Sequence, residues 1–104
     1  MNLPKKLMIG QNEYKISKSH FVFNRNLAGL INYHTKEILI RKTDNDRDLS
    51  ENLFHEIAHG LFKELEYNHP KITSFRNNEE FIQETGLLLR KIYLQLLKEK
   101  EVLK

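Results

Sequence analysis

The sequence predicts a single α+β domain, with β-strands in residues 1–45 and long helices at 46–67 and 79–99. Short runs of β-branched, aromatic and other apolar residues, separated by polar turns, fill the first part of the chain. Apolar residues recur at helical spacing in the two later segments. A chain of 104 residues is long enough for one modest core. We therefore expect a small antiparallel or mixed sheet packed on the first helix, with a long C-terminal helix beside it.

Two β-hairpins account for the N-terminal part. In each, two apolar or alternating runs flank a short polar turn, at residues 10–13 in the first hairpin and 34–37 in the second. Val22 and Phe23 are expected to add a few extended residues between them. The four strands are predicted at residues 7–9, 14–16, 30–33 and 38–41.

Both helices have recognisable ends. A polar, acid-rich segment precedes the first helix, and Asp46 or Asp48 is expected to cap it. This helix ends near Tyr67, because the backbone just before Pro70 avoids the helical conformation. A polar loop then leads to the second helix, which begins at about Glu79.

Composition excludes several classes of protein. The 17 basic and 14 acidic residues leave a net charge of +3 and are interspersed, so no basic patch marks a nucleic-acid-binding surface. No apolar run approaches the length of a membrane span, and no signal peptide is recognisable. The absence of cysteine excludes disulfides and thiolate metal ligands, and it favours a cytoplasmic location.

The segment His55-Glu56-Ile57-Ala58-His59 carries the most chemical information. Residues four apart lie on one face of a helix, so its two imidazoles can bind one Zn²⁺ ion. The glutamate between them can act as general base on a zinc-bound water. Because the pattern is short, the residues around it must support this interpretation.

Helical projection places the two histidines at the margin of an apolar face. At about 100° per residue, His55 and His59 lie together just beyond one border of the apolar arc, and Glu56 lies further round on the polar side. We expect the helix to pack on a core, with the histidines at its edge and the glutamate pointing into a cleft. The arc contains Leu49, Leu53, Phe54, Ile57, Ala58, Leu61 and Leu65, with Phe62 near its border.

A catalytic zinc site needs a third protein ligand and a fourth position left for water. The candidates after the motif are Glu64, Glu66, His69, Glu79, Glu80 and Glu84. Glu64 and Glu66 lie too far along the same helix to turn back, and His69 sits in a loop beside a proline.

Projection of the second helix favours Glu79. This residue lies at the edge of the apolar face, in line with Gly86, whereas Glu80 and Glu84 fall outside it. If the apolar faces of the two helices pack together, Glu79 can reach both histidines, and Gly86 allows a close backbone approach. The apolar face comprises Phe81, Ile82, Thr85, Leu88, Leu89, Ile92, Tyr93 and Leu96.

These motifs resemble those of the gluzincin metallopeptidases, and most closely those of small phage and prophage members of the ImmA/IrrE-type zinc metallopeptidase group. The resemblance covers residues 29–97. It implies a minimal zincin-like domain in which His55, His59 and Glu79 bind Zn²⁺ and Glu56 is catalytic. The adjacent Glu80 is the alternative to Glu79 as the third ligand. The matching segments are Gly-Leu-Ile-Asn-Tyr at 29–33, Glu-Ile-Leu-Ile at 37–40, Leu-Phe-His-Glu-Ile-Ala-His-Gly at 53–60 and Asn-Glu-Glu-Phe-Ile at 78–82.

Together, these inferences predict a zinc endopeptidase that hydrolyses a peptide bond of an intracellular protein. The resemblance implies a regulatory target such as a repressor. An extended substrate is expected to pair with strand 37–41 as an exposed edge. The alternative is a non-catalytic protein of phage or mobile-element origin that keeps a zincin fold and acts by binding another protein. The candidates for stabilising the oxyanion are Tyr33, His34, Tyr67 and His69.

Overall fold

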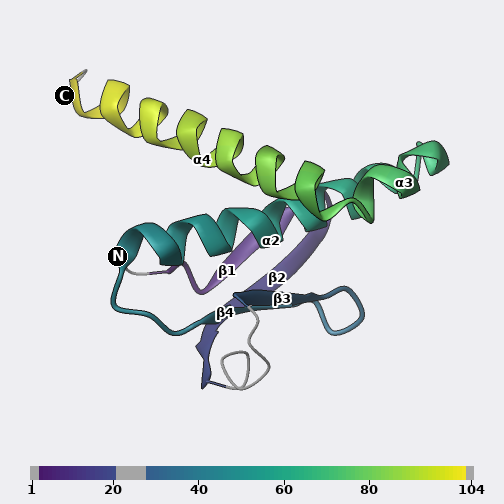
Figure 1. Cartoon of the computed structure of the whole chain (residues 1–104), viewed down its shortest axis with the longest axis horizontal. Coiled ribbons are helices and arrows are strands. Elements are labelled where there is room, and N and C mark those ends of the chain that lie inside the picture. The colour runs from purple at the N-terminus through teal and green to yellow at the C-terminus, as the bar shows by residue number, and fades with distance from the viewer. Residues whose placement is uncertain (1–2, 21–27, 103–104) are drawn as a thin grey trace.

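The computed structural model describes residues 3–20 and 28–102, with side chains described as far as residue 98. Its elements form three layers (Figure 1): a four-stranded sheet, helix α2 on one face of that sheet, and helix α4 across the outer side of α2. The predicted α+β class is confirmed.

The sheet is mixed and has the strand order β1-β2-β4-β3. Its strands are β1 (Lys6–Ile9), β2 (Asn12–Ser19), β3 (Gly29–Asn32) and β4 (Glu37–Arg41). The two predicted hairpins, β1–β2 and β3–β4, are antiparallel, and β2 pairs with β4 in parallel. Gly10, in the first turn, has φ of 63°, a conformation that glycine adopts without strain. The extended residues predicted at 22–23 lie outside the described residues.

Strand β4 is an interior strand, so the prediction that it offers a free edge is wrong. It pairs with β2 on one side and with β3 on the other. The edge of the sheet beside β4 is therefore β3. The parallel pairing joins strands from different hairpins, and local turn patterns do not encode such a contact.

Helix α2 (Asp46–Glu66) begins one residue after its cap, Asn45. The Asn45 side chain accepts a hydrogen bond from the backbone N–H of Asp48 at 3.1 Å. Asp46 and Asp48, predicted as caps, instead lie in the first turn, where their charge favours the positive end of the helix dipole. Asparagine caps a helix as well as aspartate does, which explains the shift. The predicted helix end near Tyr67 is confirmed.

The core lies between the sheet and α2. Ile38 and Ile40 of β4 are both buried, and they flank the partly exposed Leu39. Leu65 is exposed, so the apolar arc of α2 stops short of its last turn. The core cluster consists of Ile9, Tyr14, Ile16, Ile38, Ile40, Leu49 and Leu53.

The segment between the long helices was predicted as a loop, but it contains two short helices. These are η1 (Pro70–Ile72) and α3 (Thr73–Arg76). Helix α4 (Glu79–Val102) follows, and the side chain of Asn78 accepts a hydrogen bond from the N–H of Phe81 at 3.0 Å. This capped start fixes Glu79 in the first turn of α4.

Helix α4 meets α2 through Gly86. A Cβ atom on this glycine would lie 3.0 Å from backbone atoms of His55 and Phe54, so any other residue here would require the two helices to shift apart. Ile82, one turn earlier, is fully buried. Arg90, one turn later, donates from Nε to Ser50 Oγ at 2.6 Å.

The predicted packing face of α4 is therefore partly wrong. Leu88, Ile92 and Leu96 were expected to face α2 but are exposed, whereas Ile82 is buried as expected. The close approach at Gly86 rotates the helix, so that the line of residues through Ile82 and Gly86 meets α2.

Candidate metal centre

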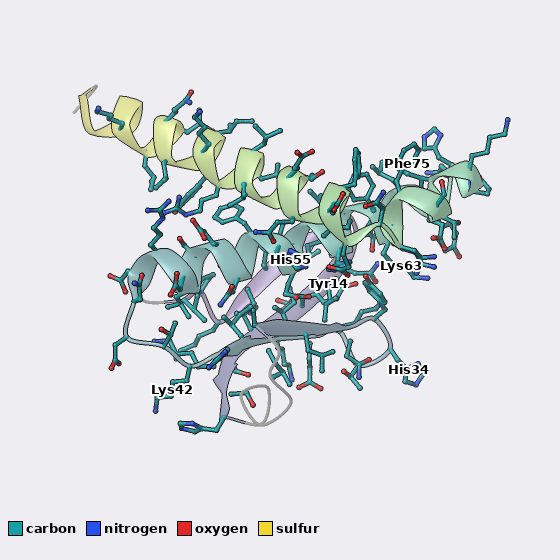
Figure 2. The ribbon with its side chains drawn as sticks, in the orientation of Figure 1. Tyr14, His34, Lys42, His55, Lys63 and Phe75 are labelled. Carbon is teal, nitrogen blue, oxygen red and sulfur yellow. The ribbon has the colours of Figure 1, made fainter. Side chains whose placement is uncertain are left out.

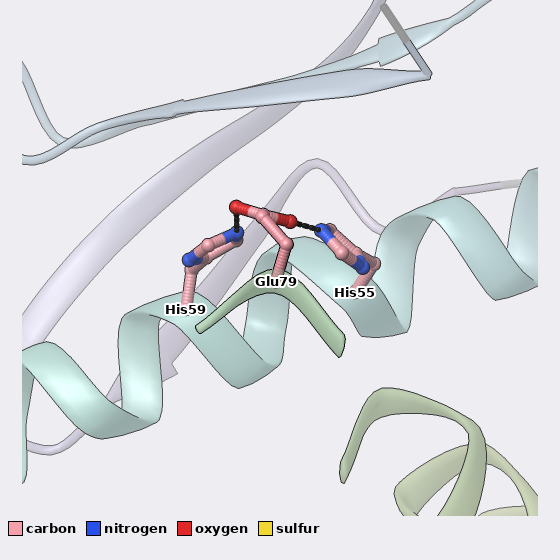
Figure 3. Close-up of side chains that lie close together, drawn as sticks. All are labelled: His55, His59 and Glu79. Atoms are coloured by element: carbon pink, nitrogen blue, oxygen red, sulfur yellow. Dashed lines mark hydrogen bonds and ion pairs between the residues drawn. The ribbon is translucent and has the colours of Figure 1, made fainter. Parts of the chain in front are cut away.

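Three side chains from two helices converge on one point (Figure 3). Nε2 of His55 lies 3.1 Å from Oε2 of Glu79, and Nε2 of His59 lies 3.1 Å from Oε1 of the same carboxylate. The three residues offer ligand atoms that all lie within 4.8 Å of one another. The structure thus brings together the three residues that the sequence predicted.

This arrangement can hold a metal ion. In a tetrahedral zinc site with bonds of about 2.0–2.1 Å, neighbouring ligand atoms lie roughly 3.3 Å apart. Each 3.1 Å distance joins a histidine nitrogen to a different oxygen of the Glu79 carboxylate, and a set with one ligand atom from each of the three residues lies within 4.8 Å. Two imidazole nitrogens and one carboxylate oxygen are donors that zinc accepts, and three protein ligands leave one position for water or substrate.

Gln83 orients His55. Its side-chain oxygen lies 2.7 Å from Nδ1 of His55. An amide oxygen only accepts hydrogen bonds, so the tautomer with its proton on Nδ1 satisfies this contact and leaves Nε2 able to bind a metal ion. Gln83 lies one helical turn after Glu79, and its role was not predicted. The i, i+4 spacing from Glu79 is the sequence signal that points to it.

The environment of His59 favours its neutral imidazole form, which is the form that binds a metal ion. Burial lowers the pKa of His59, although the nearby carboxylate of Glu79 acts in the opposite direction. Neutral imidazole is the ligand form, so the shift reduces competition between protons and a metal ion.

Glu56 is buried, which corrects its predicted place on the polar side of α2. Its side chain is only 5% exposed, and its Cγ lies 3.0 Å from where a Cβ on Gly29 would be. Strand β3 therefore passes close to Glu56 at a glycine. The projection assumed one buried face, but α2 is covered by the sheet on one side and by α4 on the other. Glu56 nevertheless lines the same cleft as His55 and His59, as expected.

The environment of Glu56 raises its proton affinity. Burial raises the pKa of Glu56 to about 8, and the negative charge of Glu79 adds to the shift. The carboxyl is therefore mostly protonated at neutral pH in the metal-free protein. A cation held by the neighbouring ligands would lower the pKa again, because opposite charge favours the ionised form.

The cleft has a volume of about 500 Å³. Gly29, Leu30 and Ile31 of β3 line one side of it. Arg76, the last residue of α3, and Asn77 line another side. The metal-binding group thus lies in a hollow beside an edge strand.

Tyr33 is the predicted oxyanion stabiliser that lines this cleft. Its hydroxyl makes only a long hydrogen bond of 3.4 Å, to the carbonyl oxygen of His59. Burial raises the pKa of Tyr33 to about 12, so the phenol stays protonated and able to donate. Figure 2 shows His34 at the β3–β4 turn, away from His55. Tyr67 and His69 line a separate hollow near the end of α2.

The other predicted carboxylate candidates do not join the group. Glu80 and Glu84 are exposed on α4 and are not part of the ligand set formed by the described residues. Glu64 accepts a hydrogen bond from the start of β2, and Glu66 forms an ion pair with Arg76. Of the two adjacent glutamates at the start of α4, the first is the one that reaches the histidines.

Arg76 brings a positive charge to the cleft. Its Nε lies 2.7 Å from Oε2 of Glu66, which ties it to the end of α2. Its charge also acts to lower the pKa of Tyr33 and of His59. Arg76 lies on α3, a helix that the sequence pattern did not predict, so its place beside the site was not foreseen.

Comparisons of the chain with protein-family models, curated proteins and solved structures find no match. The resemblance to ImmA/IrrE-type peptidases remains a prediction based on the motif residues. Among the described residues, no helix is long and apolar enough to cross a membrane.

Proposed function

We propose that this chain is a zinc-dependent peptidase of the zincin type. The observation that carries the proposal is the convergence of His55, His59 and Glu79, with the buried carboxyl of Glu56 lining the same cleft. Each of these residues has the chemistry that its proposed role requires.

His55, His59 and Glu79 would hold the ion, and Glu56 would move the protons. A bound zinc ion would polarise the scissile carbonyl and make a water molecule more acidic. Glu56 accepts a proton from the attacking water and passes it to the leaving amine. In the zinc-loaded protein, the positive charge of the ion would lower the pKa of Glu56, so that its carboxylate could accept this proton.

The substrate would bind as an extended strand along β3. The N–H of Arg41 donates to the carbonyl of Ala28 at 3.0 Å, so Ala28 and Arg41 occupy a hydrogen-bonded position next to the β3–β4 ladder. Such pairs alternate in antiparallel strands. The backbone groups of Gly29 and Ile31 therefore face away from β4, where a peptide can pair with them. Both residues line the cleft.

Tyr33 is the proposed donor to the oxyanion. It lines the cleft and keeps its proton at neutral pH. Its hydroxyl donates a long hydrogen bond of 3.4 Å to the carbonyl oxygen of His59, and this weak bond would be lost when the hydroxyl donates to the oxyanion. The proposed substrate is an intracellular protein. A regulatory target such as a repressor follows from the resemblance alone.

The test compares the zinc-loaded protein with its Glu56→Gln variant on a mixture of unfolded peptides, with cleavage read by mass spectrometry. We expect cleavage by the unaltered chain and a loss of at least about 100-fold in the variant, with zinc affinity retained. Glu84→Gln, an equivalent change at an exposed site on α4, is the matched control and should cleave normally.

Undiminished cleavage by Glu56→Gln would contradict the proposed role of Glu56. Tight zinc binding without cleavage of any peptide would instead support the alternative, a non-catalytic binding protein that keeps the metal centre.

A further inference from the structure

One side of the cleft carries a guanidinium group that the proposed reaction does not use. Arg76 lines the cleft together with Tyr33 and the metal-binding group. Zinc binding, water activation and oxyanion stabilisation are assigned to other side chains. Of the acidic and basic side chains that line the cleft in the described part of the chain, Glu56 and Glu79 have roles in the reaction and Arg76 has none.

Glu66 holds Arg76 in place without using all of its hydrogen-bond donors. Nε of Arg76 lies 2.7 Å from Oε2 of Glu66, and both side chains are 22% exposed. A guanidinium has five N–H donors in one plane, and a bidentate carboxylate accepts two of them. The other oxygen of Glu66, Oε1, lies 3.7 Å from Nζ of Lys63. Arg76 is therefore fixed at the cleft and keeps donors for a second carboxylate.

The ion pairs around Arg76 leave a net positive charge beside the cleft. Lys63 and Arg76 share the single negative charge of Glu66, so the three side chains together carry one positive charge. Nζ of Lys63 also lies 5.5 Å from the centre of the Tyr33 ring, and Tyr33 lines the cleft. A bound zinc ion would offset the negative charges of the two glutamates in the proposed site. The loaded cleft would therefore attract anionic groups rather than cationic ones.

We propose that Arg76 binds a carboxylate of the peptide substrate, supplied by an Asp or Glu side chain or by the C-terminus. The planar guanidinium matches a carboxylate in a bidentate contact, which a lysine could not provide. Strand β3 lines one side of the cleft and Arg76 lines another, so a peptide paired with β3 enters the space that Arg76 faces. This inference rests on the proposed peptidase function, because it assigns the substrate class of that cleft.

The test is selective capture of peptides by the zinc-loaded protein carrying Glu56→Gln, in which cleavage is expected to be lost. Short random peptides with amidated C-termini are passed over the immobilised protein, and the retained peptides are sequenced by mass spectrometry. We expect peptides that contain Asp or Glu to be enriched by about 10-fold or more over those with Asn or Gln instead. A second pool with free C-termini shows whether the terminal carboxylate is the preferred source.

Substitution of Arg76 should remove the preference. Adding Arg76→Gln should abolish the enrichment, whereas Lys71→Gln, an equal loss of charge at an exposed site on η1, should retain it. Arg76→Lys keeps the charge but not the planar group, and it should retain part of the enrichment. Zinc binding, measured by calorimetry, shows that each variant is folded.

A preference for carboxylates that survives Arg76→Gln would overturn the inference, because the carboxylate would then be bound by another group, such as the ion. Retention of peptides without any such preference, or no retention at all, would overturn it as well. Because the measurement is of binding, it separates the two proposals. A chain that selects acidic peptides through Arg76 but cleaves none would support this inference and refute the peptidase activity.

Discussion

Replacing Glu56 with glutamine should stabilise the metal-free protein at neutral pH. Folding raises the pKa of this carboxyl from 4.5 to about 8, because burial disfavours its charged form and Glu79 repels it. One pKa unit corresponds to about 1.4 kcal/mol. The interval between pH 4.5 and pH 7 therefore represents about 3 kcal/mol of lost stability. Glutamine keeps the shape of the side chain but does not ionise.

The direction in which stability changes with pH depends on whether the folded or the unfolded state holds the proton more tightly. Below the unfolded pKa of 4.5, Glu56 is protonated in both states and costs nothing. As the pH rises towards 8, the unfolded chain releases this proton while the folded protein retains it, so folding becomes less favourable. Above the pKa of Glu56 in the folded protein, the carboxyl is ionised in both states, and the loss of folding stability increases no further.

The assay is urea denaturation of both proteins in the presence of a chelator, at about pH 5 and pH 7. The advantage of Glu56→Gln should grow from about 1 kcal/mol or less to about 3 kcal/mol. His59, whose pKa is lowered by burial, is present in both proteins, so its contribution largely cancels from their difference. An advantage of equal size at the two pH values would refute the argument that burial holds the proton on Glu56.

Four further substitutions test the scaffold and the ligand set. Gly86→Ala should lower stability by about 1–3 kcal/mol in urea denaturation, because the new Cβ would meet the backbone of His55 at 3.0 Å. A variant as stable as the unaltered protein would show that the helices can move apart freely. Asn45→Ala should cost about 1 kcal/mol through the lost cap while leaving zinc affinity unchanged, and an equal stability would argue against the cap. Glu79→Ala should weaken zinc binding at least about 10-fold by calorimetry, whereas Glu80→Ala should not. The reverse result would identify Glu80, rather than Glu79, as the third ligand.

The metal-binding group could be predicted because its geometry is local to two helices. A spacing of four residues brings His55 and His59 together in any α-helix, whatever surrounds them. Glu79 followed from its position at the edge of the apolar face on the second helix. The structure places all three together, and it also brings Gly86 into the close contact that the sequence suggested.

The environment of the site depended on contacts that local patterns do not encode. The pairing of β2 with β4 joins two hairpins, and it makes β3 rather than β4 the edge beside the cleft. The burial of Glu56 follows from this placement of β3, since Gly29 comes into contact with its side chain. Arg76 reached the cleft through a short helix with too few residues to show periodicity.

The rotation of α4 has a similar origin. The periodicity of its leucines identifies α4 as a helix, but it does not decide which of the several rows of apolar residues along α4 packs against α2. Gly86 decides it here, because a backbone contact brings the helices closer than any leucine ridge could. The residues displaced from that contact, Leu88, Ile92 and Leu96, are exposed.

The most direct test of the metal centre is a crystal structure of the zinc-loaded protein, with the ion located by anomalous scattering. The account predicts one zinc ion per chain, bound by Nε2 of His55, Nε2 of His59 and a carboxylate oxygen of Glu79 at about 2.0–2.1 Å. The fourth position should be open to the cleft beside Glu56. Zinc held elsewhere, through His69 or Glu80, or no zinc at these three residues, would contradict it.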